Sequence, residues 1–291
     1  MGQKTEEGKN WRIVRNRVCI RALLIFLGII LMQVLAYMLC VAGIMLYGAA
    51  AKQQMSELLG NLAKADVGNG TFIIAISLIS ALLSGLWCGI LYWKSDWREH
   101  PFDYRTALSL KNILAAFATG VGFCLFLQMV LTGIAEIFPQ AFGSYNQIMG
   151  SLTDSSVFIT VLYVLLAGPA AEELIFRGAI LDRFYLAFPF WAANFLQALL
   201  FGVYHMNFIQ GMYAFCLGMV LGFVRHVSGS ILVPIFIHIL FNTTSYLTGC
   251  IFSEEDSLQT WMLFALLCIG FALLFGGLRH WWRSFQKKAV N

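Results

Sequence analysis

Charged residues are scarce in this chain. They make up only 12% of its 291 residues, whereas hydrophobic residues make up 59% and the mean hydropathy is +0.76. A soluble domain is typically about half apolar and about a quarter charged. So few charges cannot cover the surface of a soluble protein of this length. The composition excludes an ordinary soluble enzyme, a disordered chain and a nucleic-acid-binding protein with a basic surface, and it predicts a polytopic membrane protein.

The chain also lacks the short motifs of several common catalytic and metal sites. It contains no C-x-x-C pair, no H-E-x-x-H zinc motif and no G-x-S-x-G nucleophile elbow. Six of the seven cysteines lie within or beside apolar runs: Cys40, Cys88, Cys124, Cys216, Cys250 and Cys268. Cysteines in such places are typically small buried apolar residues. They therefore predict neither a disulfide framework nor a cysteine metal site.

Long uncharged runs predict about eight membrane-spanning helices. A helix needs about 20 apolar residues to cross the hydrocarbon core of a bilayer. Eight runs approach or exceed that length: Ala22–Ala51, Thr71–Trp93, Asn112–Ala135, Ser155–Ala171, Tyr185–Tyr204, Met206–Val224, Val227–Ser253 and Leu258–Leu278. The first run is about twice as long as the core of a signal peptide, so we expect it to be retained. The expected fold class is all-α, a polytopic membrane helical bundle of about eight transmembrane helices.

The positions of lysine and arginine predict how the chain threads through the membrane. If eight helices alternate in direction, all of the 19 basic residues except Lys52 and Lys64 fall on the side of the N-terminus. Basic residues accumulate on the cytoplasmic side of a membrane. We therefore expect both termini in the cytoplasm.

The polar residues of the predicted spans concentrate between positions 172 and 242. A charged group inside a span costs about 2.5–3.5 kcal/mol on insertion scales, so each one is a functional hypothesis. They form three short patterns: Glu172-Glu173-Leu174-Ile175-Phe176-Arg177, Phe201-Gly202-Val203-Tyr204-His205 and His238-Ile239-Leu240-Phe241-Asn242. Residues four apart share a face of a helix. Glu173 can therefore pair with Arg177, which leaves Glu172 as the second carboxylate.

These side chains are suited to the hydrolysis of a peptide bond without a covalent nucleophile. A carboxylate away from bulk water can act as a general base near neutral pH, and beside a neutral imidazole it could hold and deprotonate a water molecule. A second imidazole and a carboxamide could donate hydrogen bonds to the oxyanion of the tetrahedral intermediate.

The order of the three patterns, E-E-x-x-x-R, F-x-x-x-H and H-x-x-x-N on successive hydrophobic segments, resembles the CAAX protease and bacteriocin-processing (CPBP, or Abi) family of intramembrane endopeptidases. Phe176-Arg177-Gly178 after the glutamates and Gly229-Ser230-Ile231-Leu232-Val233-Pro234 before the last histidine agree with it. The resemblance covers about residues 155–250. It implies an eight-helix bundle that cuts a membrane-associated peptide or protein in or near the bilayer.

The resemblance also implies a role for each residue of the patterns. Glu172 would be the water-activating base with His205, whereas His238 and Asn242 would stabilise the oxyanion. The supporting residues would be Glu173, Arg177 and Phe201. We expect an integral protein of a bacterial plasma membrane with no nucleic-acid partner. Its parts would be three N-terminal helices (1–150), the catalytic core (151–250), and the last helix with a basic cytoplasmic tail (251–291).

Glu172, His205 and His238 also form a two-histidine, one-glutamate set that suits catalytic zinc. Two considerations favour a metal-free site. A zinc-bound histidine usually needs an acceptor for its other nitrogen, and the nearest candidate on the helix of His238 is Asn242, which could equally be an oxyanion donor. A zinc enzyme would also need Glu173 as its base, although Glu173 is expected to pair with Arg177. We therefore expect no obligatory cofactor, with zinc as the alternative.

Two other functions fit parts of the pattern. Glu172, His205 and His238 could relay protons in a proton-coupled transporter, although the paired interrupted helices of inverted-repeat transporters are not visible. A non-catalytic membrane scaffold is the third interpretation. Every position of the three patterns holds the residue expected for catalysis, so the sequence gives no support for a loss of activity.

The peptidase interpretation makes one demand on the fourth helix. If that helix ended at Glu172, the glutamate and His205 would lie near opposite sides of the membrane. They can meet only if the fourth helix runs over about Ser155–Phe188, with Pro189 starting the fifth.

Overall fold

The structure is a computed structural model that describes residues 2–54, 56, 60, 70–94, 108–153, 156–251 and 260–290. These residues are almost entirely helical and contain no strand, so the predicted all-α fold class is confirmed for them. The acidic residues Glu254, Glu255 and Asp256 and the basic residues Lys64, Arg98 and Arg105 lie outside the described residues.

Within this part of the chain, seven helices are long and apolar enough to cross a membrane. They are α1 (Gly2–Ala50), α3 (Gly70–Lys94), α5 (Leu110–Ile137), the helix Val157–Tyr185, α11 (Phe208–Ser228), α12 (Leu232–Ile251) and α13 (Thr260–Val290). Together with the composition, they make this an integral membrane protein.

The fifth helix starts where the peptidase interpretation required, next to Pro189, and not at the beginning of the uncharged run. The run Tyr185–Tyr204 is not one helix, because its first residue, Tyr185, is the last of the preceding helix and a turn over residues 186–189 follows. Pro189 has no N–H to continue a helix, and α10 (Phe190–Tyr204) begins directly after it. With 15 residues, α10 is about 22 Å long, which is shorter than the roughly 30 Å hydrocarbon core.

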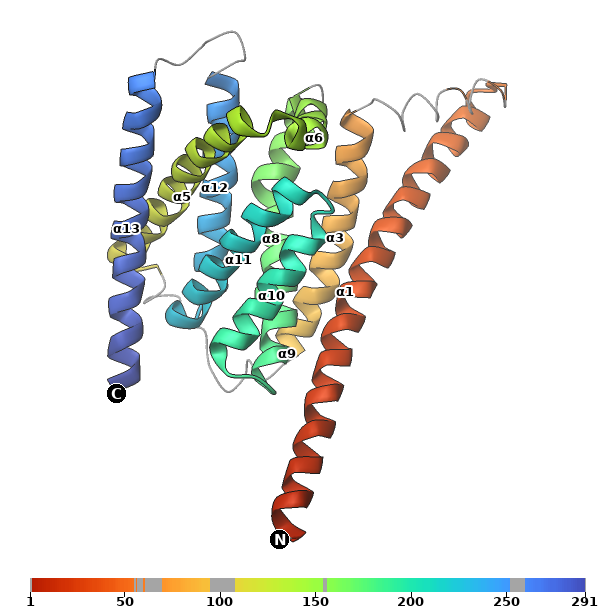
Figure 1. The fold of residues 1–291 in the computed structure, drawn as a ribbon. Helices are drawn as coiled ribbons and strands as arrows, with labels where there is room; N and C mark the ends of the chain where they lie inside the picture. Colours follow the sequence, from red (N-terminus) through yellow and green to blue (C-terminus); the bar gives the residue numbers. More distant parts are fainter. Residues whose placement is uncertain are drawn as a thin grey trace. The chain divides into compact units, whose positions relative to one another are not determined.

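The chain divides into two compact units, each built from two separate segments. Unit 1 comprises residues 1–92 and 146–193, and unit 2 comprises residues 93–145 and 194–291. The order of the helices along the chain can be followed in Figure 1.

The central helix of unit 1 is Val157–Tyr185, which carries Glu172, Glu173 and Arg177. It is continuous but changes geometry along its length: α7 (Val157–Thr160), η3 (Val161–Ala167), α8 (Gly168–Glu173), η4 (Leu174–Ile180) and α9 (Leu181–Tyr185). The expectation that this helix continues beyond Arg177 is confirmed, with ends a few residues inside the expected ones. Segments η3 and η4 are π-helical. This wider winding is rare in proteins as a whole, but where it occurs it is often at a functional site.

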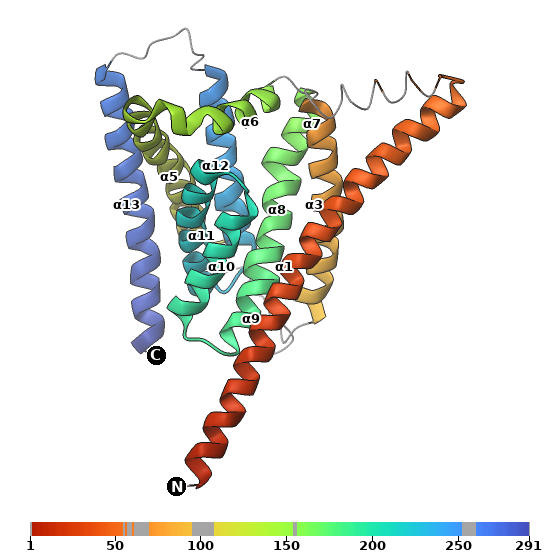
Figure 2. The same ribbon diagram turned by 45° about the vertical axis from the view of Figure 1, so that its right-hand side comes forward.

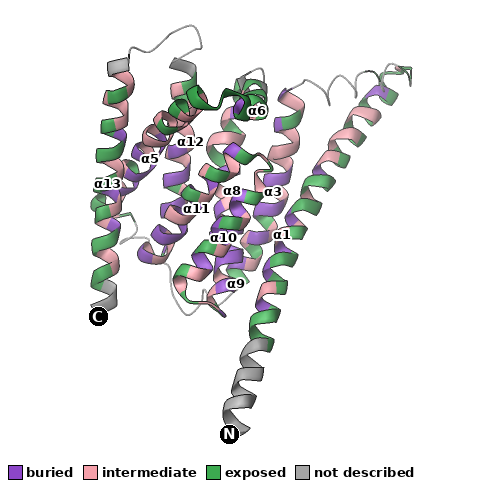
Figure 3. Cartoon of the chain, in the orientation of Figure 1, coloured by how far each residue is buried: buried purple, intermediate pink, exposed green. Residues whose placement is uncertain are grey.

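Helix α1 packs on this helix through a regular stripe. Val18, Ala22, Ile25 and Ile29 are buried, and their spacing of three and four residues puts them on one face. Helix α1 contacts the segments η4 and α9 of the helix Val157–Tyr185. Figure 3 shows that exposed and intermediate residues make up most of the described part of α1. The exposed apolar residues of α1 are suited to contact with lipid.

Unit 2 is built around α5, which lies beside both α12 and α13 (Figures 1 and 2). Its glycines allow the close approach, since a Cβ on Gly120 would lie 2.8 Å from the carbonyl oxygen of Ile237. Polar side chains link the same helices. Trp281 Nε1 donates to Thr119 Oγ1 at 3.2 Å, and Gln128 Nε2 donates to Thr248 Oγ1 at 2.6 Å.

Candidate active site

The glutamates of the first pattern lie in unit 1 and have different surroundings. Glu173 and Arg177 are fully buried, and Arg177 Nη1 donates to Glu173 Oε1 at 2.7 Å. This confirms the expected ion pair. Glu172 is only partly buried and interacts electrostatically with Arg177. Of the two carboxylates, Glu172 is therefore the one that a water molecule or a substrate reaches more easily.

The position of the ion pair coincides with a change in the helix. Glu173 is the last residue of α8, and Arg177 lies inside the π-helical segment η4. All residues of η4 except Leu174 are buried. The charged pair is thus enclosed within unit 1, where loss of one partner would leave a buried charge.

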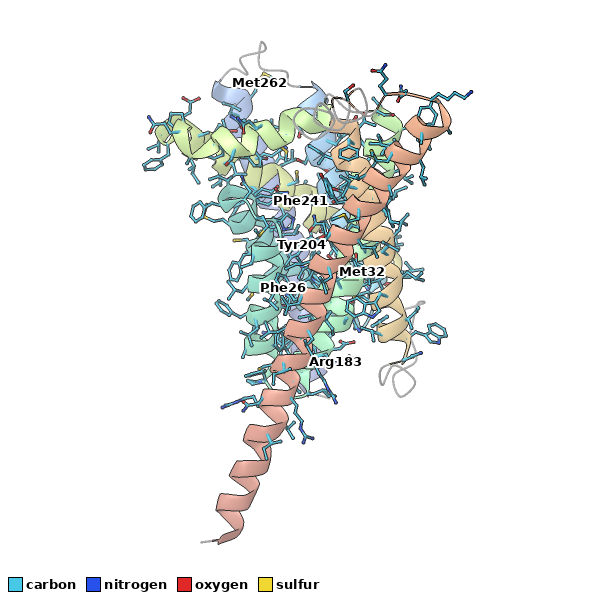
Figure 4. All side chains as sticks on the ribbon, turned by 90° about the vertical axis from the view of Figure 1, so that its right-hand side faces the viewer. Phe26, Met32, Arg183, Tyr204, Phe241 and Met262 are labelled. Carbon is cyan, nitrogen blue, oxygen red and sulfur yellow. The ribbon has the colours of Figure 1, made fainter. Side chains whose placement is uncertain are left out.

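Unit 2 brings both candidate histidines to one aromatic ring. Phe201 of α10 is buried, and its ring lies nearly perpendicular to both imidazoles. The ring centroids are 4.9 Å apart for His205 and 5.9 Å apart for His238. Phe201 therefore fixes the relative position of the two histidines. Figure 4 labels Tyr204 of α10 and Phe241 of α12, which belong to the two histidine patterns and directly precede His205 and Asn242.

The hydrogen bond of His205 determines the form of its ring. Its Nδ1 lies 2.9 Å from the carbonyl oxygen of Phe201, one helical turn earlier. A carbonyl oxygen only accepts hydrogen bonds, so Nδ1 must carry the proton. In the neutral imidazole Nε2 is then the acceptor. His205 is consequently suited to hold a water molecule through Nε2.

On α12, His238 is buried and Asn242 is partly buried one turn further along. Residues four apart share a helix face, so this spacing agrees with the expectation from the sequence. The neighbouring Phe241 continues the aromatic cluster, because its ring lies 5.8 Å from that of Phe123 and 6.3 Å from that of Tyr213.

Two amides that the sequence interpretation missed attach α10 to α11. Asn194 and Gln197 are fully buried. Asn194 Nδ2 donates to the carbonyl oxygen of Met219 at 2.9 Å, and Gln197 Nε2 donates to that of Gly218 at 2.9 Å. The signal was present as two amides three residues apart in an apolar run. A search for charges and histidines passes over it, because neither side chain is charged.

Small residues let the same two helices approach along their length. A Cβ on Gly202 would lie 2.7 Å from the carbonyl oxygen of Gly211, and one on Gly218 would lie 3.0 Å from Ala198 Cβ. At Gly222 a Cβ would collide with Asn194 Oδ1. Close approach through glycine is typical of helix packing in membranes.

The turn that follows His205 is held by a single asparagine. Met206 has a positive φ of 52°, and Asn207 then begins α11 by accepting a hydrogen bond from the N–H of Gln210 at 3.0 Å. Asn207 Nδ2 also donates to Ser144 Oγ at 3.1 Å. His205 is thus fixed on both sides, by Phe201 before it and by Asn207 after it.

The donors of the site fit zinc only in part. The bond from His205 Nδ1 to a backbone carbonyl is the arrangement that a zinc-bound histidine usually shows, so His205 has an acceptor for its second nitrogen. In unit 1, Glu173 is engaged in the ion pair with Arg177. Within the described residues of either unit, no three His, Cys, Asp or Glu side chains are placed to hold a metal ion.

Comparison with known proteins gives a family match over the candidate site residues and more distant relatives. Residues 154–244 match the family model described as Type II CAAX prenyl endopeptidase Rce1-like. "Putative membrane peptidase YdiL" of Bacillus subtilis (strain 168) is 28% identical over 134 residues, which cover 45% of this chain and 54% of that protein. An "Uncharacterized 24.3 kDa protein" of Escherichia coli is 25% identical over 145 residues, 48% of this chain and 66% of that one.

The chain therefore spans about half to two thirds of the length of these curated relatives. No solved structure matches it. The family match includes all three polar patterns, from Glu172 to Asn242. Residues 154–244 are thus similar to the type II CAAX prenyl endopeptidases, and the resemblance to the CPBP family of intramembrane endopeptidases is confirmed.

Proposed function

We propose that this protein is an intramembrane endopeptidase that hydrolyses a peptide bond of a membrane-associated peptide or protein. The observation that carries the proposal is the pair of histidines on Phe201, with His205 bonded through Nδ1 to a carbonyl oxygen. His205 is only partly buried, and its bond to the carbonyl oxygen leaves Nε2 as the acceptor nitrogen of a neutral ring beside a second histidine. The family match over the three patterns supports the same reaction.

In the proposed reaction Glu172 is the general base and His205 orients the water molecule. Glu172 takes one proton of the water molecule while the water oxygen adds to the carbonyl carbon of the scissile bond. The second O–H of the water donates a hydrogen bond to His205 Nε2. The proton held by Glu172 then passes to the amide nitrogen as the C–N bond breaks. Water and peptide are thus converted to a carboxylic acid and an amine, with the glutamate regenerated.

His238 and Asn242 would stabilise the oxyanion of the tetrahedral intermediate. Each can donate an N–H to an oxygen that gains charge during the addition step, which lowers the barrier in a site away from bulk water. The buried pair of Glu173 with Arg177 would hold the helix that presents Glu172, and Phe201 would hold both histidines.

The proposed mechanism needs no obligatory metal. If zinc were bound, Glu172, His205 and His238 would hold it, and it would supply a water molecule of lowered pKa. We place the protein in a bacterial plasma membrane with both termini in the cytoplasm, a membrane-associated substrate and no nucleic-acid partner.

The test is a comparison of the peptides in membranes that contain the wild-type protein or a variant. Replacement of a positioned acid or base typically lowers a rate by about 10²–10⁴-fold. Glu172→Gln and His205→Ala should each abolish the appearance of the product peptides, with the protein still inserted at normal levels. Glu136→Gln, at an exposed glutamate of α5, is the matched control and should leave them unchanged.

Identical peptides from wild-type and Glu172→Gln membranes would overturn the proposal. Proton-coupled solute uptake that required the same residues, without any cleaved peptide, would favour the transporter interpretation instead.

A further inference from the structure

We propose that one end of unit 2 is a docking surface for the headgroups of anionic phospholipids. The surface, termed the basic patch, consists of Lys111 at the start of α5 and Arg279, Arg283 and Lys287 on the last turns of α13. All four side chains are exposed. Lipid binding of this kind does not depend on peptidase activity.

The three residues of α13 form a single row. Arg279, Arg283 and Lys287 are spaced four residues apart, so they follow one another along the same face of the helix. Like charges at this spacing destabilise a helix slightly. Such a row is stabilised when an anion lies along it.

Contacts between helices bring Lys111 to the same place. His280, next to Arg279, donates through Nε2 to Asn112 Oδ1 at 2.8 Å, and Asn112 follows Lys111 directly. Both Lys111 and Lys287 lie near enough to His280 to act on its charge. The patch is therefore one cluster formed by the start of α5 and the end of α13.

The cluster has no matching negative charge in the described part of unit 2. Glu136 is the one acidic side chain among these residues, and it lies about 25 residues along α5 from Lys111, which is about 37 Å. The C-terminal end of α13 offers about half a negative charge through the helix dipole. That cannot balance four cations, so the patch is complementary to an anion.

Aromatic side chains beside the row indicate that this anion is a lipid headgroup. Trp282 is 46% exposed, and its ring lies 6.1 Å from Phe223 of α11 and 5.6 Å from Phe285. Exposed tryptophan near the end of a membrane-spanning helix is typical of the headgroup region. The row also lies on the last turns of an apolar helix long enough to span the bilayer. Phosphate groups of phospholipids occur at that depth.

The test measures the affinity of the full-length protein for spin-labelled phosphatidylglycerol and phosphatidylcholine in nanodiscs. The triple variant Arg279→Gln, Arg283→Gln, Lys287→Gln should lower the affinity for phosphatidylglycerol at least tenfold, since each charge is worth about fivefold near an anionic surface. Affinity for phosphatidylcholine should not change. The variant Arg279→Lys, Arg283→Lys keeps the charge and should keep most of the binding.

The matched control is Lys52→Gln, which removes an exposed charge from unit 1 and should leave the preference for phosphatidylglycerol intact. If the triple variant folds poorly, the wild-type protein gives a second measurement, because its preference must fall as salt is raised. An unchanged preference in the triple variant, or a salt-independent preference in the wild type, would overturn the proposal.

Discussion

A single carbonyl oxygen determines how His205 can act. Because the carbonyl oxygen of Phe201 accepts a hydrogen bond from Nδ1, the acceptor nitrogen of the neutral His205 ring is Nε2, whether it faces a water molecule or a metal ion. The same residue carries the ring that lies between the two histidines. Phe201 therefore contributes backbone and side chain to the candidate site, and a small residue at this position would lose the second contribution alone.

Metal removal separates the two chemistries open to these side chains. We expect the purified protein to keep its cleavage activity after treatment with a strong chelator, because Glu173 is committed to Arg177 and is not available as the base of a zinc enzyme. The measurement is peptide cleavage together with elemental analysis. Activity that disappears on chelation and returns with about one equivalent of zinc would refute the metal-free mechanism, above all if His238→Ala also abolished zinc binding.

The buried ion pair gives a prediction on stability. Arg177→Met should destabilise the protein by about 3–5 kcal/mol, because it leaves the carboxylate of Glu173 buried without its cation. The double variant Glu173→Leu, Arg177→Met should be much closer to wild type, since no buried charge remains. Thermal unfolding in detergent measures both. Equal losses in the single and double variants would show that packing, rather than charge, dominates at this place.

At the scale of elements, the close packing of α10 on α11 depends on glycine residues, where a side chain would collide with the neighbouring helix. Gly222→Ala should destabilise unit 2 by about 1–3 kcal/mol, the usual cost of overpacking, because the new methyl group would collide with Asn194. Gly276→Ala is the matched control, since a Cβ there meets no atom within 4 Å. Unfolding of the two variants is compared in the same detergent. Equal stability of both would mean that the hairpin adjusts at no cost.

The sequence predicted most of the helices and the pairing within them, because hydrophobic length and four-residue spacing are local properties. The continuation of the helix beyond Arg177 was predicted only because the proposed peptidase chemistry requires Glu172 and His205 to meet. The start of α10 after Pro189 was predicted by the same argument, although the uncharged run by itself shows no boundary there. The π-helical segments η3 and η4 have no simple sequence signal, and the amides of Asn194 and Gln197 were hidden by their lack of charge.

At the scale of the whole molecule, the number of membrane crossings depends on α10. Seven helices in the described residues are long enough to span, so termini on the same side require that the shorter α10 also cross. We expect cytoplasmic labelling of a cysteine placed at the C-terminus and external labelling of one at Glu254, as the distribution of basic residues predicts. A C-terminus labelled from outside would mean that α10 does not cross and that the basic tail is external.

The interleaving of the two units has a consequence for biosynthesis. Unit 1 needs residues 146–193, which leave the ribosome only after residues 93–145 of unit 2. The stripe on α1 (Val18, Ala22, Ile25 and Ile29) therefore faces lipid until its partner helix has been synthesised. Its side chains are all apolar and suit that environment. The charges of Glu173 and Arg177, by contrast, need no other helix for their pairing. They lie one turn apart on the same helix, so they can enter the lipid already neutralised, before any other helix has arrived.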